Sequence, residues 1–261
     1  MIDILNFNPN ALLLFFLILL RVSGIFVTAP VVSSRTVPRR VRAYAAILCT
    51  LIVFNIVPKV DLLVDFDVLQ YFLIALKETM VGLMLGVVPR VMFAAVELAG
   101  AIIGFQMGFS IANVVDPQTD VQVSVIGSFE TVLATLLFVI LDGHHVFFEA
   151  MATSYTHIPI KGFLFTANKI DFLLRLMGDL FIIAVKIGAP FIVALLMANI
   201  IMGFMARSIP QMNVFVVGFP FTIGVGLLLL LIGTPYMVQA MVELFNTVET
   251  RVIELIQIMA K

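Results

Sequence analysis

The sequence predicts an all-α integral membrane protein with about six to seven hydrophobic helices in hairpins. Composition is the first reason: 62% of the 261 residues are hydrophobic and 12% are charged, whereas a soluble domain is roughly 45–50% apolar and about 25% charged. The second reason is a series of apolar runs near the ~20 residues that a membrane-spanning helix needs. The net charge of −1 gives no indication of a nucleic-acid partner.

The apolar runs differ in length and in how they are separated. MIDILNFNPN has no basic residue ahead of ALLLFFLILL, so we interpret the first run as a membrane helix and not as a cleaved signal. Only Pro89 and Arg90 separate the third and fourth runs, which predicts a tight hairpin or one broken helix. The seven candidate spans are 11–32, 43–57 (short for a span), 68–88, 91–115, 123–141, 180–206 and 214–237.

Six ionisable residues interrupt these runs. A charge at mid-bilayer costs at least ~2.5–3.5 kcal/mol on insertion scales, so such residues must pair, line water or face protein. Neighbouring residues on a helix point about 100° apart, so Lys77 and Glu78 are not expected to pair with each other. We therefore expect a chain that packs most of its surface against other subunits. The six are Arg21, Lys77, Glu78, Glu97, Glu130 and Lys186.

Basic residues gather in the loop SSRTVPRRVR, after the first run. The positive-inside rule places this loop in the cytoplasm and Met1 outside. The orientation of the later helices stays open, because the loop at Arg207 faces outward if all seven runs cross and inward if 91–141 makes one net crossing. The basic residues are Arg35, Arg39, Arg40 and Arg42.

Small residues recur at every fourth position in VELAGAIIGFQMGFSIANVVDPQTD. This spacing predicts a smooth helical ridge that another backbone can approach closely. The ridge leads into a polar turn at Asp116-Pro117, because a residue before proline is pushed out of the helical region. Ordinary packing and a loop that closes an aqueous path both fit this pattern. The ridge residues are Gly100, Gly104, Gly108 and Ala112.

The stretch FVILDGHHVFFEAMATSYTHIPIKG raises a metal hypothesis. Asp142, His145 and Glu149 could share one helix face, while His144 is the neighbour of His145 and cannot use the same face. The favoured alternative is a polar helix cap in which Asp142 interacts with the helix N-terminus.

The stretch ARSIPQMNVFVVGFP separates two very apolar arms. Pro210 breaks the helix, Arg207 suits the end of the preceding helix, and Asn213 caps the next one. Further on, six apolar residues form a narrow heptad stripe, which predicts an amphipathic helix for a partner, a fold-back or a membrane surface. The stripe consists of Met241, Phe245, Val248, Val252, Leu255 and Met259.

Catalytic motifs are weakly represented. The sequence contains neither a Walker A loop nor a GxSxG motif. The single cysteine, Cys49, lies in the apolar stretch AAILCTLIVF without a nearby polar residue, which makes a nucleophilic role improbable.

Three stretches together carry a resemblance to a known family. GFQMGFSIANVVDPQ, LDGHH followed by SYTHIPIKG, and RSIPQMNVFVVGFP resemble the flagellar form of the FliR/SctT family of type III secretion export-gate subunits. The motifs occur in the family's order over most of the chain, whereas the N-terminal third resembles the family only in its apolar runs and Arg-rich loop.

The resemblance implies a fold and a set of functional positions. It implies a FliP-like part over residues 1–175 and a FliQ-like helical hairpin plus an amphipathic helix over 176–261. It implies a partner-facing hairpin tip at Arg207, Pro210, Gln211 and Asn213. It also implies a plug loop near 105–120, with plug or pore residues Gly104, Phe105, Gln106, Met107, Gly108, Asn113, Asp116 and Pro117.

The resemblance also implies an assembly. A single copy of such a chain joins FliP and FliQ in the bacterial inner membrane, at the flagellar basal body, with FlhB packed on the cytoplasmic side and FlhA nearby. That gate passes unfolded flagellar proteins and is not an enzyme, so no catalytic, cofactor-binding or metal-binding residue is expected.

Two other classes of function stay open. A small-solute transporter or channel subunit could use Glu97, Glu130 and Lys186 as a coupling path, although no inverted repeat is visible between the halves. A membrane enzyme that used His144, His145 and Glu149 would contain a bound metal.

Overall fold

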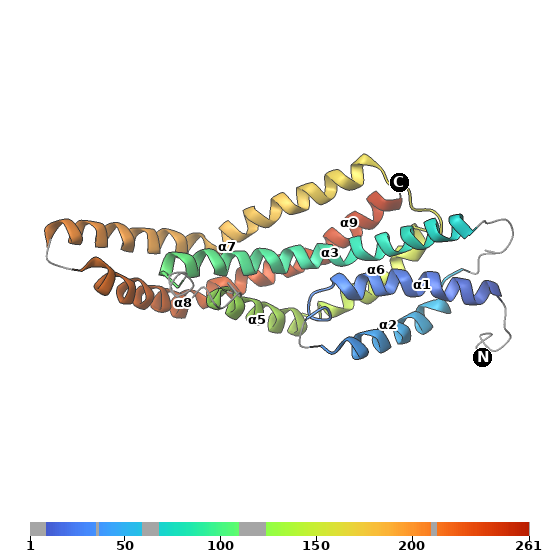
Figure 1. Ribbon diagram of the computed structural model, residues 1–261, viewed down its shortest axis with the longest axis horizontal. Helices are drawn as coiled ribbons and strands as arrows, with labels where there is room; N and C mark the ends of the chain where they lie inside the picture. The colour runs from blue at the N-terminus through green and yellow to red at the C-terminus, as the bar shows by residue number, and fades with distance from the viewer. Residues whose placement is uncertain (1–8, 35–36, 59–67, 110–123, 210–212, 261) are drawn as a thin grey trace. The chain divides into compact units, whose positions relative to one another are not determined.

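A computed structural model describes residues 9–34, 37–58, 68–109, 124–209 and 213–260. Every regular element in these ranges is a helix (Figure 1), so the predicted all-α class is confirmed. The helices are α1 (Pro9–Thr28), α2 (Arg39–Phe54), α3 (Val68–Met107), α5 (Val125–Ile140), α6 (His144–His157), α7 (Ala167–Ser208), α8 (Val214–Asn246) and α9 (Val248–Ala260).

Fewer spans are present than the seven apolar runs predict. Four stretches among the described residues are helical, long and apolar enough to cross a membrane: α1, α3, α7, and α8 continued by α9. The bent pair of α5 and α6 makes a fifth if it counts as one span. The run at 43–57 forms α2, whose 16 residues are short of the ~20 that a span needs.

The predicted break at Pro89 and Arg90, whether a tight hairpin or a broken helix, is wrong. Residues 68–107 form one continuous helix of 40 residues with Pro89 inside it. Proline removes one backbone hydrogen bond, but within transmembrane helices neighbouring groups and local adjustments of the backbone can compensate for that loss. Pro190 likewise lies inside α7, and Pro220 and Pro235 lie inside α8.

Two helices are much longer than a bilayer requires. At 1.5 Å rise per residue, the 40 residues of α3 and the 42 of α7 each extend about 60 Å, against a hydrocarbon core about 30 Å thick. Tilt alone does not absorb a twofold excess. Parts of both helices are therefore expected to lie outside the hydrocarbon layer.

The helices group into two compact units that are each discontinuous in sequence. The first unit contains residues 1–91, 142–176 and 246–261, and the second contains residues 92–141 and 177–245. The division predicted between residues 175 and 176 concerns likeness to other subunits, and it stays a prediction.

The first unit is built on two helix pairs, α1 with α2 and α6 with α9. The amphipathic C-terminal helix therefore folds back within its own chain: Val252 and Leu255 of α9 are buried, and this helix packs along α6. All six residues of the heptad stripe are buried, from Met241 to Met259.

The second unit contains a long helical hairpin. The carboxyl-terminal part of α7 and the amino-terminal part of α8 run antiparallel (Figure 1). The hydroxyl of Tyr236 in α8 donates to the carbonyl of Lys186 in α7 at 3.1 Å. A Cβ at Gly233 would approach the Phe191 ring at 2.5 Å, so the missing side chain at Gly233 is what allows the ring to pack there.

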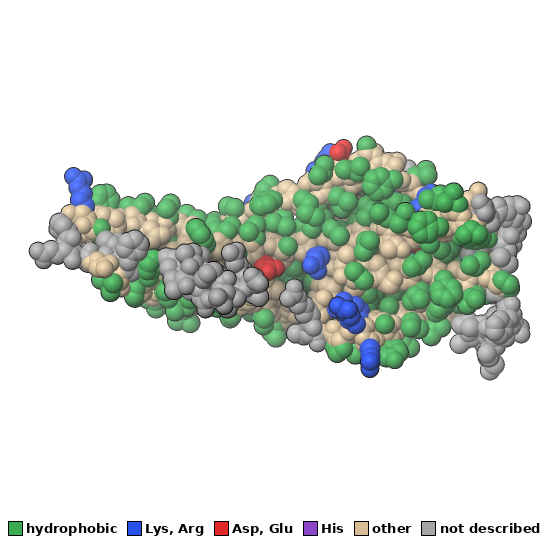
Figure 2. Space-filling view, viewed as in Figure 1, with side chains coloured by type: hydrophobic (Ala, Val, Ile, Leu, Met, Phe, Trp, Pro, Cys, Tyr) green, Lys and Arg blue, Asp and Glu red, His purple; other side chains and the backbone are tan. Residues whose placement is uncertain are grey.

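Much of the surface is apolar. On the face shown in Figure 2, hydrophobic side chains cover most of the area and charged side chains are few. Only 28% of the most apolar window of α7 and 22% of that of α8–α9 are buried within the chain. These helices therefore have large apolar faces for lipid or for other protein chains.

Candidate functional site

Two residues of the predicted ridge, Gly100 and Gly104, lie in α3 against the start of α5, inside the second unit, whereas Gly108 lies beyond the end of α3 and outside the predicted helical ridge. A Cβ at Gly100 would lie 2.7 Å from the Cα of Gly127, and a Cβ at Gly127 would lie 2.9 Å from the carbonyl oxygen of Glu97. Distances this short leave no room for a side chain on either helix. The two backbones approach each other because both positions are glycine.

A carboxyl group is enclosed at this crossing. Glu130 of α5 is fully buried, and a Cβ at Gly100 would come within 2.8 Å of its Cδ. Among the described residues, neither carboxyl oxygen of Glu130 has a well-aligned hydrogen-bond partner, and its polar neighbour is the backbone of Gly100. A buried carboxyl without a hydrogen-bond partner lowers the stability of the fold. The packing of α3 against α5 therefore does not explain why position 130 is a glutamate.

The two residues that flank segment 110–123, Phe109 and Ser124, each take part in a hydrogen bond near this crossing. The N–H of Phe109 donates to the carbonyl of Gly104 at 3.1 Å, which closes the end of α3. On the other side, the hydroxyl of Ser124 accepts from the N–H of Gly127 at 3.0 Å and caps α5. The same hydroxyl lies 3.5 Å from the carbonyl of Gly100. The start of α5 therefore lies beside the last turns of α3.

The end of α3 is also held by α8. Thr222 donates through its hydroxyl to the carbonyl of Met107 at 3.1 Å, which satisfies one of the carbonyls that a helix end leaves without a partner. Gly226 leaves room for the Met107 side chain, which is fully buried. Gly108 follows with φ +92° and faces the ring of Phe219, so glycine is required there for its backbone conformation as well as for space.

The predicted plug residues differ in how deeply they are buried, and some of them lie outside the described residues. Met107 is fully buried, whereas Phe105 is 70% exposed. Gln106 is half-buried, and its amide oxygen has no hydrogen-bond partner among the described residues. The predicted plug positions Asn113, Asp116 and Pro117 lie outside the described residues, as does Ala112 of the predicted ridge.

The hairpin tip has the local structure that the residue types indicate. Arg207 is exposed in the last turn of α7, where a cation interacts favourably with the helix dipole. The side-chain oxygen of Asn213 accepts from the N–H of Val216 at 3.4 Å, so it caps the start of α8. Pro210 and Gln211 lie outside the described residues.

A buried ion pair lies in the first unit, between two of the six charges whose pairing partners the sequence left open. Arg21 of α1 and Glu78 of α3 are 0% and 1% exposed, and Arg21 Nε donates to Glu78 Oε2 at 2.7 Å. Arg21 also donates to the hydroxyl of Ser154 at 3.3 Å and to the carbonyl of Ile158 at 3.1 Å. Its guanidinium lies 4.0 Å from the centre of the Tyr155 ring. One arginine thus joins three segments.

The other charges in the apolar runs have different surroundings. Glu97 and Lys186 are exposed and Lys77 is half-buried, while Glu130 is buried. Glu97 and Lys186 are therefore accessible to groups outside the chain.

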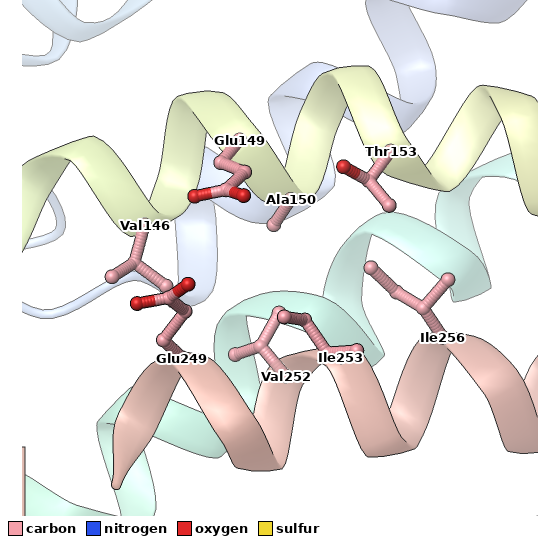
Figure 3. Close-up of a pocket in the computed structure, with 8 residues that line it drawn as sticks. All are labelled: Val146, Glu149, Ala150, Thr153, Glu249, Val252, Ile253 and Ile256. Carbon is pink, nitrogen blue, oxygen red and sulfur yellow. The ribbon is translucent and has the colours of Figure 1, made fainter. Parts of the chain in front are cut away.

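The helix cap expected from Asp142 is absent. Gly143 is the N-cap of α6, and no side chain caps this helix. The set of residues in the metal hypothesis also differs from the predicted one, because His144 takes the place of Glu149. Donor atoms of Asp142, His144 and His145 lie within 4.8 Å of one another. Glu149 instead lines a small pocket between α6 and α9, on the same side as Glu249 (Figure 3).

Comparison with known proteins places this architecture in a family. Residues 12–248 match the family described as bacterial export proteins, family 1. The flagellar biosynthetic protein FliR of Bacillus subtilis (strain 168) is 37% identical over 240 residues, which cover 90% of this chain and 92% of that protein. FliR of Escherichia coli (strain K12) is 33% identical over 237 residues, covering 90% and 89%. FliR of Aquifex aeolicus (strain VF5) is 32% identical over 231 residues, covering 87% of both. The chain is thus a component of the flagellar export apparatus, and it belongs to the family of bacterial export proteins that includes the flagellar biosynthetic protein FliR.

Proposed function

We propose that this chain is a structural subunit of the flagellar type III export gate, and that it helps both to form and to close the channel for unfolded flagellar proteins. The observation that carries the proposal is the anchoring of segment 110–123. The residues that flank this segment are held within their own helices, Phe109 by Gly104 and Ser124 by Gly127, and the Ser124 hydroxyl also lies 3.5 Å from the carbonyl of Gly100 in α3. A segment held in this way can lie across a path without its ends moving.

The proposed partners are FliP and FliQ, with FlhB on the cytoplasmic side and FlhA nearby. Two features support neighbours made of protein. The exposed apolar faces of α7 and α8 extend along helices longer than a bilayer is thick. The exposed Glu97 and Lys186 are costly against lipid and acceptable against protein. The proposed location is the inner membrane, at the flagellar basal body.

Purification from membranes tests the assembly. We expect this chain to co-purify in one copy with several copies of FliP and FliQ, and the ratio can be measured by native mass spectrometry. A stable homo-oligomer of this chain that transports a small solute would instead support a transporter, with Glu97, Glu130 and Lys186 as its coupling path.

Membrane permeability tests closure. Deletion of part of residues 110–118 should make membranes that contain the assembled complex leaky to small solutes. The matched control is a deletion of the same length within residues 59–67, another segment between helices. Unchanged permeability in an assembled complex that lacks residues from 110–118 would argue against a plug there.

The hairpin tip is proposed to meet a partner through Arg207, Pro210, Gln211 and Asn213 on the cytoplasmic face. A cysteine that replaces Ser208, introduced with Cys49→Ser, should react with a membrane-impermeant maleimide only after the cytoplasmic side is opened. Labelling from outside in intact cells would refute this orientation.

A further inference from the structure

Three metal-ligating side chains converge where the chain enters α6. One donor atom from each of Asp142, His144 and His145 lies within 4.8 Å of the other two. The Oδ1 of Asp142 and the Nδ1 of His145 are 3.8 Å apart, and the two imidazole rings lie 4.4 Å apart at a tilt of 31°. The rings therefore lie side by side, although residues adjacent in a helix point about 100° apart.

The backbone explains how three neighbours in sequence can converge. Asp142 has φ 56°, in the left-handed region that aspartate tolerates better than most residues. The N–H of His145 donates to the carbonyl of Asp142 at 2.8 Å, which closes a tight turn over Gly143. This turn brings the Asp142 side chain back beside the first two residues of α6.

The Asp142 carboxylate is available for a ligand. Aspartate just before a helix commonly caps the N-terminus, but α6 has Gly143 as its N-cap and no side-chain cap. The side chains of Asp142 and His145 are 71% and 69% exposed. An ion could therefore reach them and keep water molecules in its remaining coordination positions.

We propose that Asp142, His144 and His145 bind a divalent transition-metal ion, with Zn²⁺ as the ion that fits best. Zinc bonds to imidazole nitrogen and carboxylate oxygen are ~2.0–2.2 Å long, so two ligands of one ion lie at most about 4.3 Å apart. The 3.8 Å pair already meets this limit, and the half-buried His144 needs its donor atom to move by about 0.5 Å, which a small side-chain rotation supplies. Two imidazoles with one carboxylate favour zinc, copper or nickel over magnesium and calcium, which take oxygen ligands.

The site joins Asp142, which precedes the helix, to the first turn of α6. A bound ion therefore fixes the turn over Gly143 and the start of α6. The site is separate from the glycine crossing at Gly100 and Gly127, and its failure would leave the proposed export function untouched.

Zinc binding by the full-length chain in detergent tests the site, with a purification tag that contains no histidine. The sequence contains three histidines, and the third, His157, is exposed at the end of α6 with its Nδ1 near the carbonyl of Thr153. His157→Gln is therefore a matched control. Competition with a chromophoric chelator should give one Zn²⁺ per chain, and His144→Gln, His145→Gln and Asp142→Asn should each weaken binding at least about tenfold.

A second readout guards against variants that fail to fold. Co²⁺ added to the wild-type chain should give visible absorption bands that His157→Gln retains and His145→Gln loses. Equal affinity in all three histidine variants would mean an adventitious ion only, and it would overturn the proposal, as would the absence of any Zn²⁺ binding above background.

Discussion

Two helix crossings in this molecule are built in opposite ways. In the first unit, α1, α3 and the end of α6 meet around Arg21, whose guanidinium reaches a carboxylate, a hydroxyl, a carbonyl and an aromatic ring. In the second unit, α3 and α5 meet through the backbone at Gly100 and Gly127, and among the described residues the nearby carboxyl of Glu130 has no well-aligned hydrogen-bond partner. The first crossing pairs its buried carboxylate with an arginine, although Oε1 of Glu78 has no hydrogen-bond partner among the described residues, and the second crossing pairs neither oxygen of Glu130.

The difference indicates distinct roles for the two crossings. A buried pair that hydrogen-bonds to several segments fixes one arrangement of helices, and it is strongly destabilising to break. A crossing of small residues depends on close backbone approach and is sensitive to added volume. The second crossing also carries both ends of segment 110–123. We therefore interpret the first crossing as a scaffold and the second as the base of the proposed plug segment.

The largest expected effect comes from removing one member of the ion pair. Arg21→Met or Glu78→Leu alone should cost about 3–5 kcal/mol, because each leaves a charge buried without a partner. The double variant should recover most of this loss, because it removes both charges. The stability of the wild type, the two single variants and the double variant can be compared by their resistance to protease in membranes. A double variant as unstable as the single variants would show that the scaffold needs the charges themselves.

Added volume at the glycine crossing should have a smaller but clear effect. Gly127→Ala places a methyl group 2.9 Å from the carbonyl of Glu97, and overpacking of this kind costs about 1–3 kcal/mol. Gly178→Ala in α7 is the control, because a Cβ there has no neighbour within 4 Å and alanine favours helix. Thermal stability in detergent distinguishes the two, and equal stability of both variants would contradict the close crossing.

Glu130 should contribute least to stability. Glu130→Gln removes no well-aligned hydrogen bond to the described residues, and the amide keeps an oxygen beside the backbone of Gly100, so the thermal stability of this variant should stay within about 1 kcal/mol of the wild type. A loss as large as that of Glu78→Leu would mean that Glu130 has a partner after all. Loss of flagellar export with unchanged stability would assign Glu130 a role in the working gate.

Sequence reasoning predicted local features well, because their causes are local. The heptad stripe from Met241 to Met259 is buried, since helical periodicity determines which residues share a face. Asn213 caps α8 and Arg207 lies in the last turn of α7, as helix-end chemistry predicts.

Features that depend on distant residues were missed or misjudged. The pairing of Arg21 with Glu78 joins positions 57 residues apart, and no pattern in either run indicates the other. Pro89 was read as a break because proline disfavours helix locally, yet the helix continues through it. The two histidines were judged unable to share a helix face from periodicity alone, yet their rings lie 4.4 Å apart. The left-handed backbone that places Asp142 beside them leaves no clear mark in the sequence.

Solute permeability of assembled gates that carry Gly108→Ala tests the central claim most directly. Gly108 has φ +92°, and a Cβ there would lie 2.9 Å from Phe219, so alanine strains the base of segment 110–123. The comparison is the Arg21→Met, Glu78→Leu double variant in the scaffold. Leakage with Gly108→Ala and tight membranes with the double variant, both in complexes of normal composition, is the predicted result. Tight membranes with Gly108→Ala, or equal leakage from both, would contradict the assignment of closure to this segment.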